Sequence, residues 1–415
     1  MKRVLLLLPT ASYRNDDFLA AAGKLDVEFI TVANHCHRLA PLMGMSPILS
    51  VPFDQPLVAV EQVSAALGRK PDVALAVDDA GLELAALLCE RLRLPGNPPA
   101  AVRLTRDKLA FRRLLQRGSF NCPAFYHLGN DAGATMLQPP LEFPVVVKAR
   151  QRSGSRGVIR ADDTPAFAKA VERVRGIQGK YDREAATLGL VVERFIPGFE
   201  YALEGLLENG RLRVLALFDK PDPMDGPYFE ETMYVTPSRL PQAAQDAIAE
   251  TARRACMLAG LTSGPVHAEM RVNELGVWLL EIAARSIGGL CGRILGNALG
   301  MSLEEMILRH ALDQPLPQAR HGEASGVMMI PIPGRGIFRG ARNLESAMQI
   351  PGITDIEVTA TPGQIIAPPP EGASYLGFIF AHATSPCAVE SGLREAHRRI
   401  VFDIQADIPV NRARA

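Results

Sequence analysis

Near the N-terminus, three short apolar runs alternate with stretches of helical composition. The runs cover residues 4–8, 27–32 and 71–77, and an Ala-rich segment and residues 82–92 supply helices between and after them. Apolar runs of this length are typical of strands that are buried on both faces. Strands that alternate with helices pair in parallel, so this pattern predicts an open α/β layer.

The turn after the first apolar run does not have the sequence of a dinucleotide site. Pro9-Thr10-Ala11-Ser12 stands where a G-x-G-x-x-G turn would bring the backbone close to a pyrophosphate. We therefore interpret the layer as a scaffold, and a Rossmann oxidoreductase is disfavoured.

The length and the charge balance limit the kinds of partner. A chain of 415 residues is long for one core, so several domains are expected. The 45 basic and 45 acidic residues create no overall field for nucleic acid or an anionic membrane, which favours a small-molecule substrate. The apolar run that ends at Pro9 is too short for a signal peptide, and no other stretch could span a bilayer. A cytoplasmic location is expected.

The cysteines do not suggest a metal or redox motif. The six are spread along the chain without a close pair, which is typical of buried thiols. His35-Cys36-His37 could bind a metal, but neighbouring residues of an extended segment point to opposite faces and no nearby residue completes a tetrahedron. A metal site there is disfavoured.

Beyond a Pro-rich stretch at residues 314–317, the chain has the pattern of a small α+β unit. The segment before that stretch contains nearly all residues with suggestive chemistry. In the C-terminal unit, strands are predicted at residues 326–331, 356–359, 364–367 and 376–381, with a helix at residues 388–400.

Two lysines of the central segment are candidates for binding an anion. Lys108 lies in a predicted helix at residues 103–111, where most lysines are simply solvated. Lys148 lies near the end of a buried strand at residues 143–150, before a loop rich in Gly, Ser and Arg. A lysine within an apolar strand is costly without an anionic partner, and flexible backbone N–H groups suit a polyphosphate. We favour phosphate binding over the alternative of a β-hairpin with a polar tip.

Residues 190–201 are predicted to form a buried strand, a hinge and the start of a second strand. Extended backbone beside an apolar wall can present the N–H and C=O groups that an adenine edge requires. Glu200 could accept hydrogen bonds from ribose hydroxyl groups. Taken alone, this segment would only be a strand with a turn.

The strongest feature is a predicted β-hairpin made by residues 266–272 and 277–282. Alternation places His267 and Glu269 on one face. With a three-residue loop, Glu269 lies directly opposite Glu281, with Cβ atoms about 5 Å apart. A divalent cation would turn the repulsion between these carboxylates into coordination, and carboxylate oxygens suit magnesium.

Arg285 follows the hairpin, close enough to offer its guanidinium to a phosphoryl or acyl-phosphate group. A large side chain next to it would restrict a pocket. Gly288 and Gly289 instead leave space beside the arginine for a bulky substrate.

In this order, the four features resemble the ATP-grasp superfamily, and within it the carboxylate–amine ligases that are similar to L-amino acid ligases. The resemblance covers nearly the whole chain and implies an ATP-grasp fold that combines α/β and α+β domains. Residues 1–98 would be an N-terminal open α/β domain, and residues 99–312 the ATP-grasp lobes with a flexible lid lobe at residues 122–195. Residues 313–415 would be the small C-terminal α+β domain.

The resemblance also implies a role for each candidate residue. Arg285 and His267 would be catalytic, and Glu269 and Glu281 would hold magnesium. The segment at residues 227–237 would lie beside the substrate, where an acidic residue can hold an amino group. The substrate set is Glu231, Tyr234, Arg285, Gly288 and Gly289. The nucleotide set is Lys108, Lys148, Ser153, Gly154, Ser155, Gly157, Glu193, Arg194, Phe195, Ile196 and Glu200.

One position departs from the family pattern. Glu-x-Asn-x-Arg is usual, whereas Ala283 stands between Glu281 and Arg285, so a neutral magnesium ligand is missing. Water can replace such a ligand, because magnesium commonly keeps several waters. We therefore expect catalysis to be retained.

The activity that the resemblance implies is ATP-dependent ligation of a small carboxylate to an amine through an acyl phosphate, with an amino acid as one substrate. ATP and Mg²⁺, for which Mn²⁺ can substitute, are the expected cofactors. Neither nucleic acid nor a membrane is an expected partner, and a homodimer is compatible with the superfamily. The alternatives are other ATP-grasp chemistry, such as a bicarbonate-activating carboxylase, and a nucleotide-binding protein without turnover.

Overall fold

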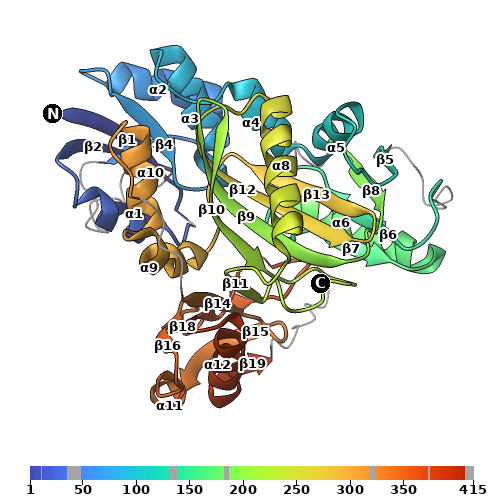
Figure 1. The fold of residues 1–415 in the computed structure, drawn as a ribbon. Coiled ribbons are helices and arrows are strands. Elements are labelled where there is room, and N and C mark those ends of the chain that lie inside the picture. The colour runs from blue at the N-terminus through green and yellow to red at the C-terminus, as the bar shows by residue number, and fades with distance from the viewer. Residues whose placement is uncertain are drawn as a thin grey trace, which may run out of the picture. The chain divides into compact units, whose positions relative to one another are not determined.

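The computed structural model describes residues 1–10, 12–34, 48–130, 139–181, 187–317, 323–372 and 374–406 (Figure 1). The chain divides into two compact units. The first comprises Met1–Cys122, Tyr201–Phe218 and Leu240–Gly322, and the second comprises Pro123–Glu200, Asp219–Arg239 and Glu323–Ala415. Because the units are discontinuous in sequence, the three contiguous sequence domains stay a prediction. Among the described residues, no helix is both long and apolar enough to cross a bilayer.

The N-terminal layer of the first unit is the predicted open parallel sheet. Its strands follow the order β3-β2-β1-β4, and each neighbouring pair is parallel. Helix α3 begins before the predicted residue 82, because the side chain of Asp78 accepts a hydrogen bond from the Asp79 N–H and caps the helix. The elements are β1 (Lys2–Leu8), α1 (Asn15–Ala22), β2 (Val27–Ala33), β3 (Ile48–Ser50), α2 (Pro56–Ala66), β4 (Val73–Ala76) and α3 (Asp79–Leu92).

The central part of the first unit is built on strands in the order β13-β12-β9-β10. Their apolar side chains form one core with residues of the helices α3, α4, α5 and α8. This core holds the strands that carry the candidate site. The elements are α4 (Pro99–Arg106), α5 (Lys108–Arg117), β9 (Phe199–Glu208), β10 (Arg211–Asp219), α8 (Gln242–Ala259), β12 (Gly264–Asn273), β13 (Gly276–Ala283), η3 (Cys291–Leu295), α9 (Gly296–Leu299) and α10 (Leu303–Ala311).

The prediction of a single helix around Lys108 is wrong. Helix α4 ends at Arg106 and α5 begins at Lys108, with Asp107 in an extended conformation between them. The Asp107 carboxylate accepts hydrogen bonds from the N–H groups of Leu109 and Ala110 at 3.0 and 3.2 Å. Aspartate is a preferred N-cap residue, so it starts a new helix here and places Lys108 in the first turn.

The strands of the second unit between residues 125 and 194 form an antiparallel sheet in the order β5-β8-β6-β7. Helix α6 packs on one face of this sheet through Phe167, Val171 and Val174. Strands β6 and β7 form a β-hairpin, so Lys148 lies on a hairpin strand next to its polar tip. The elements are β5 (Phe125–Leu128), β6 (Val145–Ala149), β7 (Val158–Ala161), α6 (Thr164–Tyr181) and β8 (Leu190–Arg194).

The C-terminal part of the second unit confirms the predicted α+β pattern. Strands β11, β14, β18 and β16 are neighbours in that order, and α12 packs on them. The prediction missed β15 and β19, because Gly336, Gly340 and a register shift after Phe338 interrupt the two-residue period of β15. The elements are β11 (Met233–Thr236), β14 (Ala324–Ile330), β15 (Gly336–Arg342), α11 (Leu344–Met348), β16 (Ile353–Val358), β17 (Ile365–Ile366), β18 (Gly377–Ala383), α12 (Pro386–Arg399) and β19 (Val401–Ala406).

The described cysteines form no disulfide with one another. Cys89, Cys256 and Cys291 are buried as expected, but Cys122 is half-buried and Cys387 is exposed, so the expectation of buried thiols is wrong for Cys387. Cys387 lies in the first turn of α12, which begins at the surface. The sequence His35-Cys36-His37 lies outside the described residues.

We predict that native Cys89 and Cys256 resist alkylation near neutral pH. Burial raises the pKa of the Cys89 thiol to about 11 and that of Cys256 to about 12, so their reactive thiolates are scarce. An unfolded thiol has a pKa of about 8.5. The two raised pKa values therefore add to the free energy of unfolding below about pH 8.5, and this contribution is lost as the pH rises toward the pKa values of the folded protein. Mass spectrometry after iodoacetamide treatment should find the label on the exposed Cys387 before the buried Cys89 and Cys256, and equal labelling of Cys89 would contradict the prediction.

Candidate active site

The β12–β13 hairpin places Glu269 directly opposite Glu281, which confirms the predicted pairing. The predicted three-residue loop is wrong, because Asn273 pairs with Gly276 and leaves a two-residue turn. The Asn273 side chain accepts the Leu275 N–H at 2.9 Å, and Gly276 has a φ of 105°, which closes the tighter turn. A register shift after Glu269 then restores the pairing of the two carboxylates.

Each of the two carboxylates has a basic neighbour. The Lys108 Nζ atom lies 3.4 Å from Glu281 Oε2, and His267 Nε2 lies 3.3 Å from Glu269 Oε1. The side chains of Glu269 and Glu281 remain 25% and 32% exposed. The start of α5 therefore brings Lys108 to the acidic hairpin.

The paired carboxylates fit a divalent cation. Both offer oxygen ligands, both remain accessible, and their mutual repulsion is relieved by a cation between them. Ala283 is buried two residues beyond Glu281 and contributes no side-chain oxygen. Glu269 and Glu281 would therefore be the protein ligands, with waters in the remaining positions.

His267 is buried between two carboxylates. Its Nδ1 atom lies 3.2 Å from Oε2 of Glu204, on the neighbouring strand β9, and its Nε2 atom faces Glu269. Burial opposes a charged imidazole, but the hydrogen bonds with Glu204 and Glu269 outweigh it and raise the pKa of His267 to about 9. Burial raises the pKa of the fully buried Glu204.

Sequence reasoning missed Glu204. A charged residue within an otherwise apolar strand was the available signal, since residues 202–207 contain no other ionisable side chain. The same signal was used for Lys148. It shows that such a residue needs a partner, but it does not say which one.

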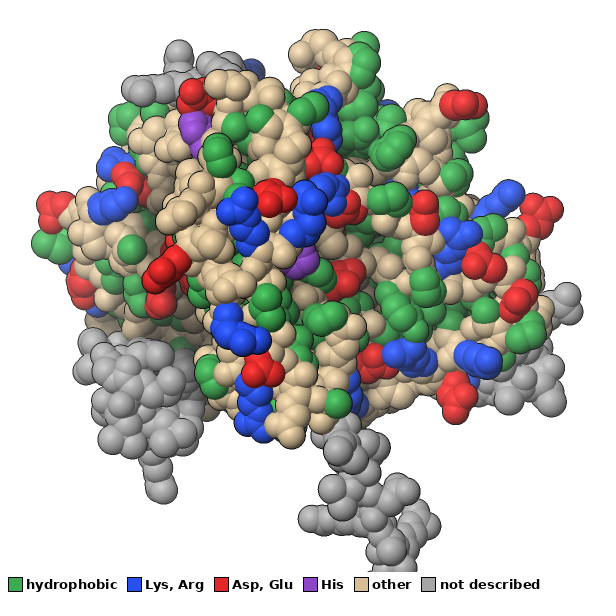
Figure 2. Space-filling model, turned by 90° about the horizontal axis from the view of Figure 1, so that it is seen from below, with side chains coloured by type: hydrophobic (Ala, Val, Ile, Leu, Met, Phe, Trp, Pro, Cys, Tyr) green, Lys and Arg blue, Asp and Glu red, His purple; other side chains and the backbone are tan. Residues whose placement is uncertain are grey.

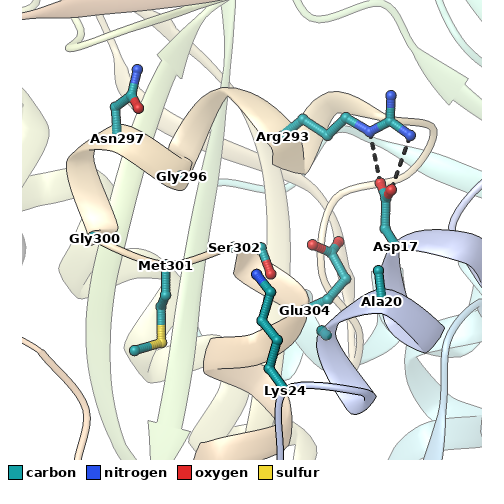
Figure 3. A pocket seen from close by; sticks show the side chains of 11 residues that line it. Asp17, Ala20, Lys24, Arg293, Gly296, Asn297, Gly300, Met301, Ser302 and Glu304 are labelled. Carbon is teal, nitrogen blue, oxygen red and sulfur yellow. Dashed lines mark hydrogen bonds and ion pairs between the residues drawn. The ribbon is translucent and has the colours of Figure 1, made fainter.

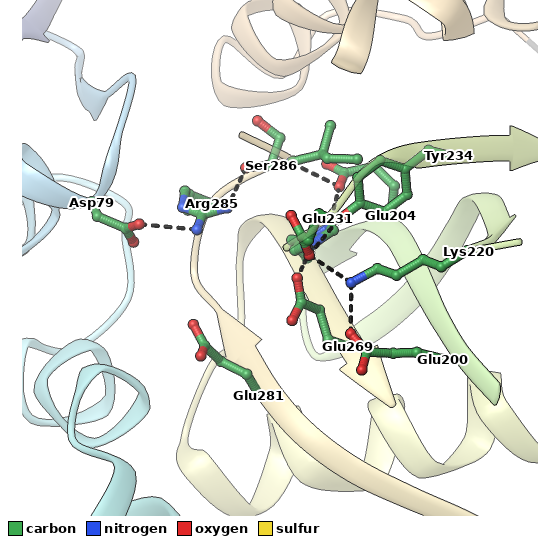
Figure 4. A network of polar contacts seen from close by, with 12 residues as sticks. Asp79, Glu200, Glu204, Lys220, Glu231, Tyr234, Glu269, Glu281, Arg285 and Ser286 are labelled. Atoms are coloured by element: carbon green, nitrogen blue, oxygen red, sulfur yellow. Dashed lines mark hydrogen bonds and ion pairs between the residues drawn. The ribbon is translucent and has the colours of Figure 1, made fainter. Parts of the chain in front are cut away.

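The Arg285 guanidinium forms an ion pair with Asp79, in which Nη2 lies 2.9 Å from Oδ2, and it donates a hydrogen bond to the Ser286 carbonyl oxygen (Figure 4). Burial opposes ionisation of Asp79, but the charge and hydrogen bond of Arg285 outweigh it and lower the Asp79 pKa. Asp79 lies in the first turn of α3 and was not among the predicted site residues. The arginine is thus oriented by the N-terminal layer.

The residues after Arg285 are also anchored. Ser286 Oγ accepts a hydrogen bond of 2.6 Å from Arg14, whose other terminal nitrogen pairs with the buried Glu304 at 2.9 Å. The Ile287 N–H donates to Glu204 Oε2 at 2.9 Å. This segment is therefore fixed by side chains from several parts of the first unit.

The predicted glycines differ in their surroundings. A Cβ placed on Gly288 would meet no atom of the described residues within 4 Å, so these residues leave the predicted open space at this position. Gly289 has a φ of 59°, in the left-handed region that favours glycine. Their contact with a substrate stays a prediction.

In the second unit, the anionic partner of Lys148 is Glu193. Lys148 on β6 and the buried Glu193 on β8 form a close ion pair across the sheet. The argument that a strand lysine requires an anion is thus met within the protein, and the phosphate contact stays a prediction. Gly154, Ser155 and Gly157 in the following loop all have positive φ angles, of 63°, 54° and 67°.

The predicted adenine hinge uses two of its own donors. The N–H of Arg194 donates to the Ala124 carbonyl at 2.9 Å, and the N–H of Phe195 donates to the Pro144 carbonyl at 2.9 Å. Ile196 is buried, whereas Arg194 is exposed. These bonds fix the hinge, and the role of the segment in binding adenine stays a prediction.

Lys220 connects two acids that the sequence assigned to different ligands. Its Nζ atom lies 2.8 Å from Glu200 and 2.6 Å from Glu231, and it is 4% exposed (Figure 4). Tyr234 donates to Glu231 at 2.9 Å, and its ring lies 5.2 Å from the ammonium. The structure therefore brings Glu200, Glu231 and Tyr234 together around a lysine that sequence reasoning missed.

Glu230 is a further acid that sequence reasoning missed. Its Oε1 atom is buried and has no hydrogen-bond partner among the described residues. Burial raises the pKa of Glu230, against the opposing hydrogen bond from the Ile332 backbone. A buried carboxylate oxygen without a partner is suited to a cationic ligand, whereas the neighbouring Glu231 already pairs with Lys220.

Two other surface features are not part of this site. On the side shown in Figure 2, basic and acidic side chains are interspersed, in line with the balanced sequence. A pocket of about 500 Å³ in the first unit lies beside α1 and the segment from η3 to α10, where Arg293 pairs with Asp17 (Figure 3). None of the predicted site residues lines it.

Comparison with known protein families finds a match in the central segment and another in the C-terminal segment of the chain. An ATP-grasp domain matches residues 141–294, and an L-amino acid ligase C-terminal domain 2 matches residues 328–405. The L-amino acid ligase structure from Bacillus licheniformis is 25% identical, with a TM-score of 0.85, and the match covers 98% of this chain and 99% of that one.

Two curated relatives are similar over part of the chain. Carnosine synthase 1 of Gallus gallus is 30% identical over 65% of this chain and 31% of its own length. Alanine–anticapsin ligase of Bacillus subtilis is 27% identical over 54% of this chain and 50% of its own length. This chain thus spans about a third of the carnosine synthase. The ATP-grasp match, the L-amino acid ligase match and the full-length structural likeness agree, and the chain contains an ATP-grasp domain followed by an L-amino acid ligase C-terminal domain 2.

Proposed function

We propose that the protein is an ATP-dependent carboxylate–amine ligase that forms an amide or peptide bond and releases ADP and phosphate. The observation that carries the proposal is the hairpin that sets Glu269 opposite Glu281 and leads directly into Arg285. Two carboxylates for a divalent cation and a guanidinium for a phosphoryl group are suited to phosphoryl transfer.

The relatives support an amino acid as one substrate. One of them is named as the ligase of alanine and anticapsin, and the full-length structural relative as an L-amino acid ligase. The C-terminal family match supports the same substrate class. In this proposal Glu230, with its unpartnered oxygen, joins Glu231 as a candidate for holding the substrate ammonium group.

ATP-grasp proteins use ATP with a divalent metal ion. We propose Mg²⁺, with Mn²⁺ as a substitute, held by Glu269 and Glu281. When bound, the ion would neutralise charge on the transferring phosphoryl group. Lys108 and Lys148 would contact the nucleotide phosphates, which requires each lysine to exchange a carboxylate partner for a phosphate.

In the proposed reaction, a carboxylate oxygen of the first substrate attacks the γ-phosphorus of ATP, and the bond to the bridging oxygen breaks. ADP leaves with that electron pair, and an acyl phosphate forms. The amine nitrogen of the second substrate then attacks the acyl carbon, phosphate leaves and the nitrogen loses a proton. Arg285 would stabilise negative charge on the acyl phosphate and on the tetrahedral oxygen.

We predict that ATP is cleaved to ADP and phosphate and that release requires both a carboxylate and an amine. The reason is that attack occurs at the γ-phosphorus and the acyl phosphate is consumed by the amine. Chromatography of the nucleotides, together with product masses over pairs of amino acids and small acids, tests this expectation. AMP and pyrophosphate as products would remove the proposal.

One observation keeps a second function in view. Ala283 contributes no metal ligand, which would suit a protein that binds nucleotide without turnover. In that case ADP and ATP bind, but no carboxylate–amine pair releases phosphate. Release that depends on bicarbonate instead of an amine would identify a carboxylase.

We predict that Lys148→Met weakens ATP binding and slows turnover without unfolding the protein. The substitution removes the cation at the phosphate loop, while the ion pair with Glu193 that it also breaks is partly exposed on the lysine side. Calorimetric titration with ATP and a melting curve measure the two effects. Lys169→Met, at an exposed position on α6 of the same unit, is the matched control. Full activity of Lys148→Met would show that the phosphate role is wrong.

A further inference from the structure

Glu204 lies at the point where two parts of the candidate site meet. It is completely buried on β9, and its Oε2 atom accepts two hydrogen bonds. One comes from His267 Nδ1 at 3.2 Å and the other from the Ile287 N–H at 2.9 Å. A single carboxylate oxygen therefore joins strand β12 to the segment that follows β13.

Each of these hydrogen bonds connects Glu204 to a different part of the candidate site. His267 continues from Glu204 to Glu269, one of the two proposed metal carboxylates, at 3.3 Å. Ile287 lies just beyond Arg285, the proposed ligand of the acyl phosphate. Glu204 itself would touch neither the metal nor the substrate.

Stability alone does not explain a glutamate at this position. The second oxygen, Oε1, is buried and has no hydrogen-bond partner among the described residues. A buried acceptor without a partner destabilises a fold, and an apolar side chain would fill the same space without that penalty. The two bonds to Oε2 are thus the feature that distinguishes glutamate from an apolar residue here.

We propose that Glu204 is a positioning residue that fixes the orientation of Glu269, through His267, and of Arg285, through Ile287. The proposal rests on the proposed ligase function. Glu204 would then set the distance between the proposed metal ligand Glu269 and Arg285, which is proposed to bind the acyl phosphate. Outer partners of this kind typically change metal affinity or activity by about 10-fold to 100-fold when they are removed.

The test is Glu204→Gln, which keeps the size of the side chain and removes its charge. The amide oxygen can still accept both hydrogen bonds, because it has two lone pairs, but it lacks the carboxylate charge and therefore holds His267 and the Ile287 N–H more weakly. Turnover should then require about tenfold more Mg²⁺ for half activation, with a rise of similar size in the KM for the carboxylate substrate. The melting temperature of the metal-free protein should hold or rise.

Two further variants make the result specific. His267→Gln removes the link from Glu204 to Glu269 but leaves the hydrogen bond between Glu204 and the Ile287 N–H, so it should raise the Mg²⁺ requirement and leave the carboxylate KM unchanged. Asp219→Asn removes another buried carboxylate, which contacts Ser238 and Arg239 in the second unit. Asp219→Asn should lower the melting temperature and leave the Mg²⁺ requirement and the KM for the carboxylate substrate unchanged.

Binding measurements separate this proposal from the ligase proposal. If the wild-type protein released no phosphate with any carboxylate–amine pair, the ligase function would fail. Calorimetry with ADP would still test Glu204, because Glu204→Gln should weaken ADP binding about tenfold in Mg²⁺ and not in EDTA. The positioning role would be overturned if Glu204→Gln kept the wild-type ADP affinity in Mg²⁺ or the wild-type kinetic constants. It would also be overturned if Asp219→Asn showed the same kinetic changes as Glu204→Gln. Should Glu204→Gln not fold, an unchanged Mg²⁺ requirement in His267→Gln would overturn it as well.

Discussion

Glu281→Gln should lower turnover by about two to three orders of magnitude, because a divalent cation supplies several kcal/mol of charge stabilisation and Glu281 is proposed to be one of its two protein ligands. Glu269→Gln should behave alike. The repulsion between the opposed carboxylates is relieved by either change, whereas Glu281→Gln also removes a partly exposed ion pair with Lys108 worth less than about 1 kcal/mol. The melting temperature of the metal-free protein should therefore change little.

The measurement is phosphate release against Mg²⁺ concentration, alongside melting curves without metal. Glu274→Gln is the matched control, since Glu274 lies at the exposed turn of the same hairpin and should keep wild-type activity. Wild-type Mg²⁺ dependence in both glutamine variants would mean that Glu269 and Glu281 are structural.

Arg285→Met should lower turnover by about 10²-fold to 10³-fold, the effect of removing one preorganised donor to a developing oxyanion. The loss should appear in kcat with both substrates saturating, while ADP binding stays near the wild-type value. The reason is that Arg285 is proposed to contact the acyl phosphate and not the nucleotide that remains as ADP.

The control for Arg285→Met is a second arginine in the first unit. Arg293 forms a similar partly buried ion pair, with Asp17 at 2.8 Å, and lies outside the candidate site. Arg293→Met should cost stability and leave turnover unchanged. If both variants lost activity to the same extent, the effect of Arg285 would be structural.

The sequence was most informative where the structure is local. The apolar run at residues 4–8 predicted β1, because burial of a parallel strand on both faces requires an uninterrupted apolar segment. Residues 27–32 were also predicted correctly as a strand, although Glu28 and Thr31 interrupt their apolar character and most of β2 is only partly buried. The opposition of Glu269 and Glu281 was also predicted correctly, although the turn and the register shift that produce it were not. An error in loop length was cancelled by a β-bulge, and neither can be read from alternation alone.

Local reasoning failed where one residue changed the backbone direction. Asp107 divides the predicted helix around Lys108 into α4 and α5, since its side chain caps the second helix. The glycines of β15 hid that strand, because an interrupted two-residue period resembles a loop. In both cases a short-range preference outweighed the hydrophobic pattern.

The sequence by itself determined which residues carry charge in apolar strands and turns, and hence that Lys148, Glu269, Glu281 and Arg285 require partners. Only the tertiary structure decided which partners these are. Arg285 meets Asp79, Glu204 meets His267, and Lys220 meets Glu200 and Glu231. A buried charge selects its partner by proximity after the chain has packed, and residues that are distant in sequence become neighbours only through packing of the strands and helices that carry them.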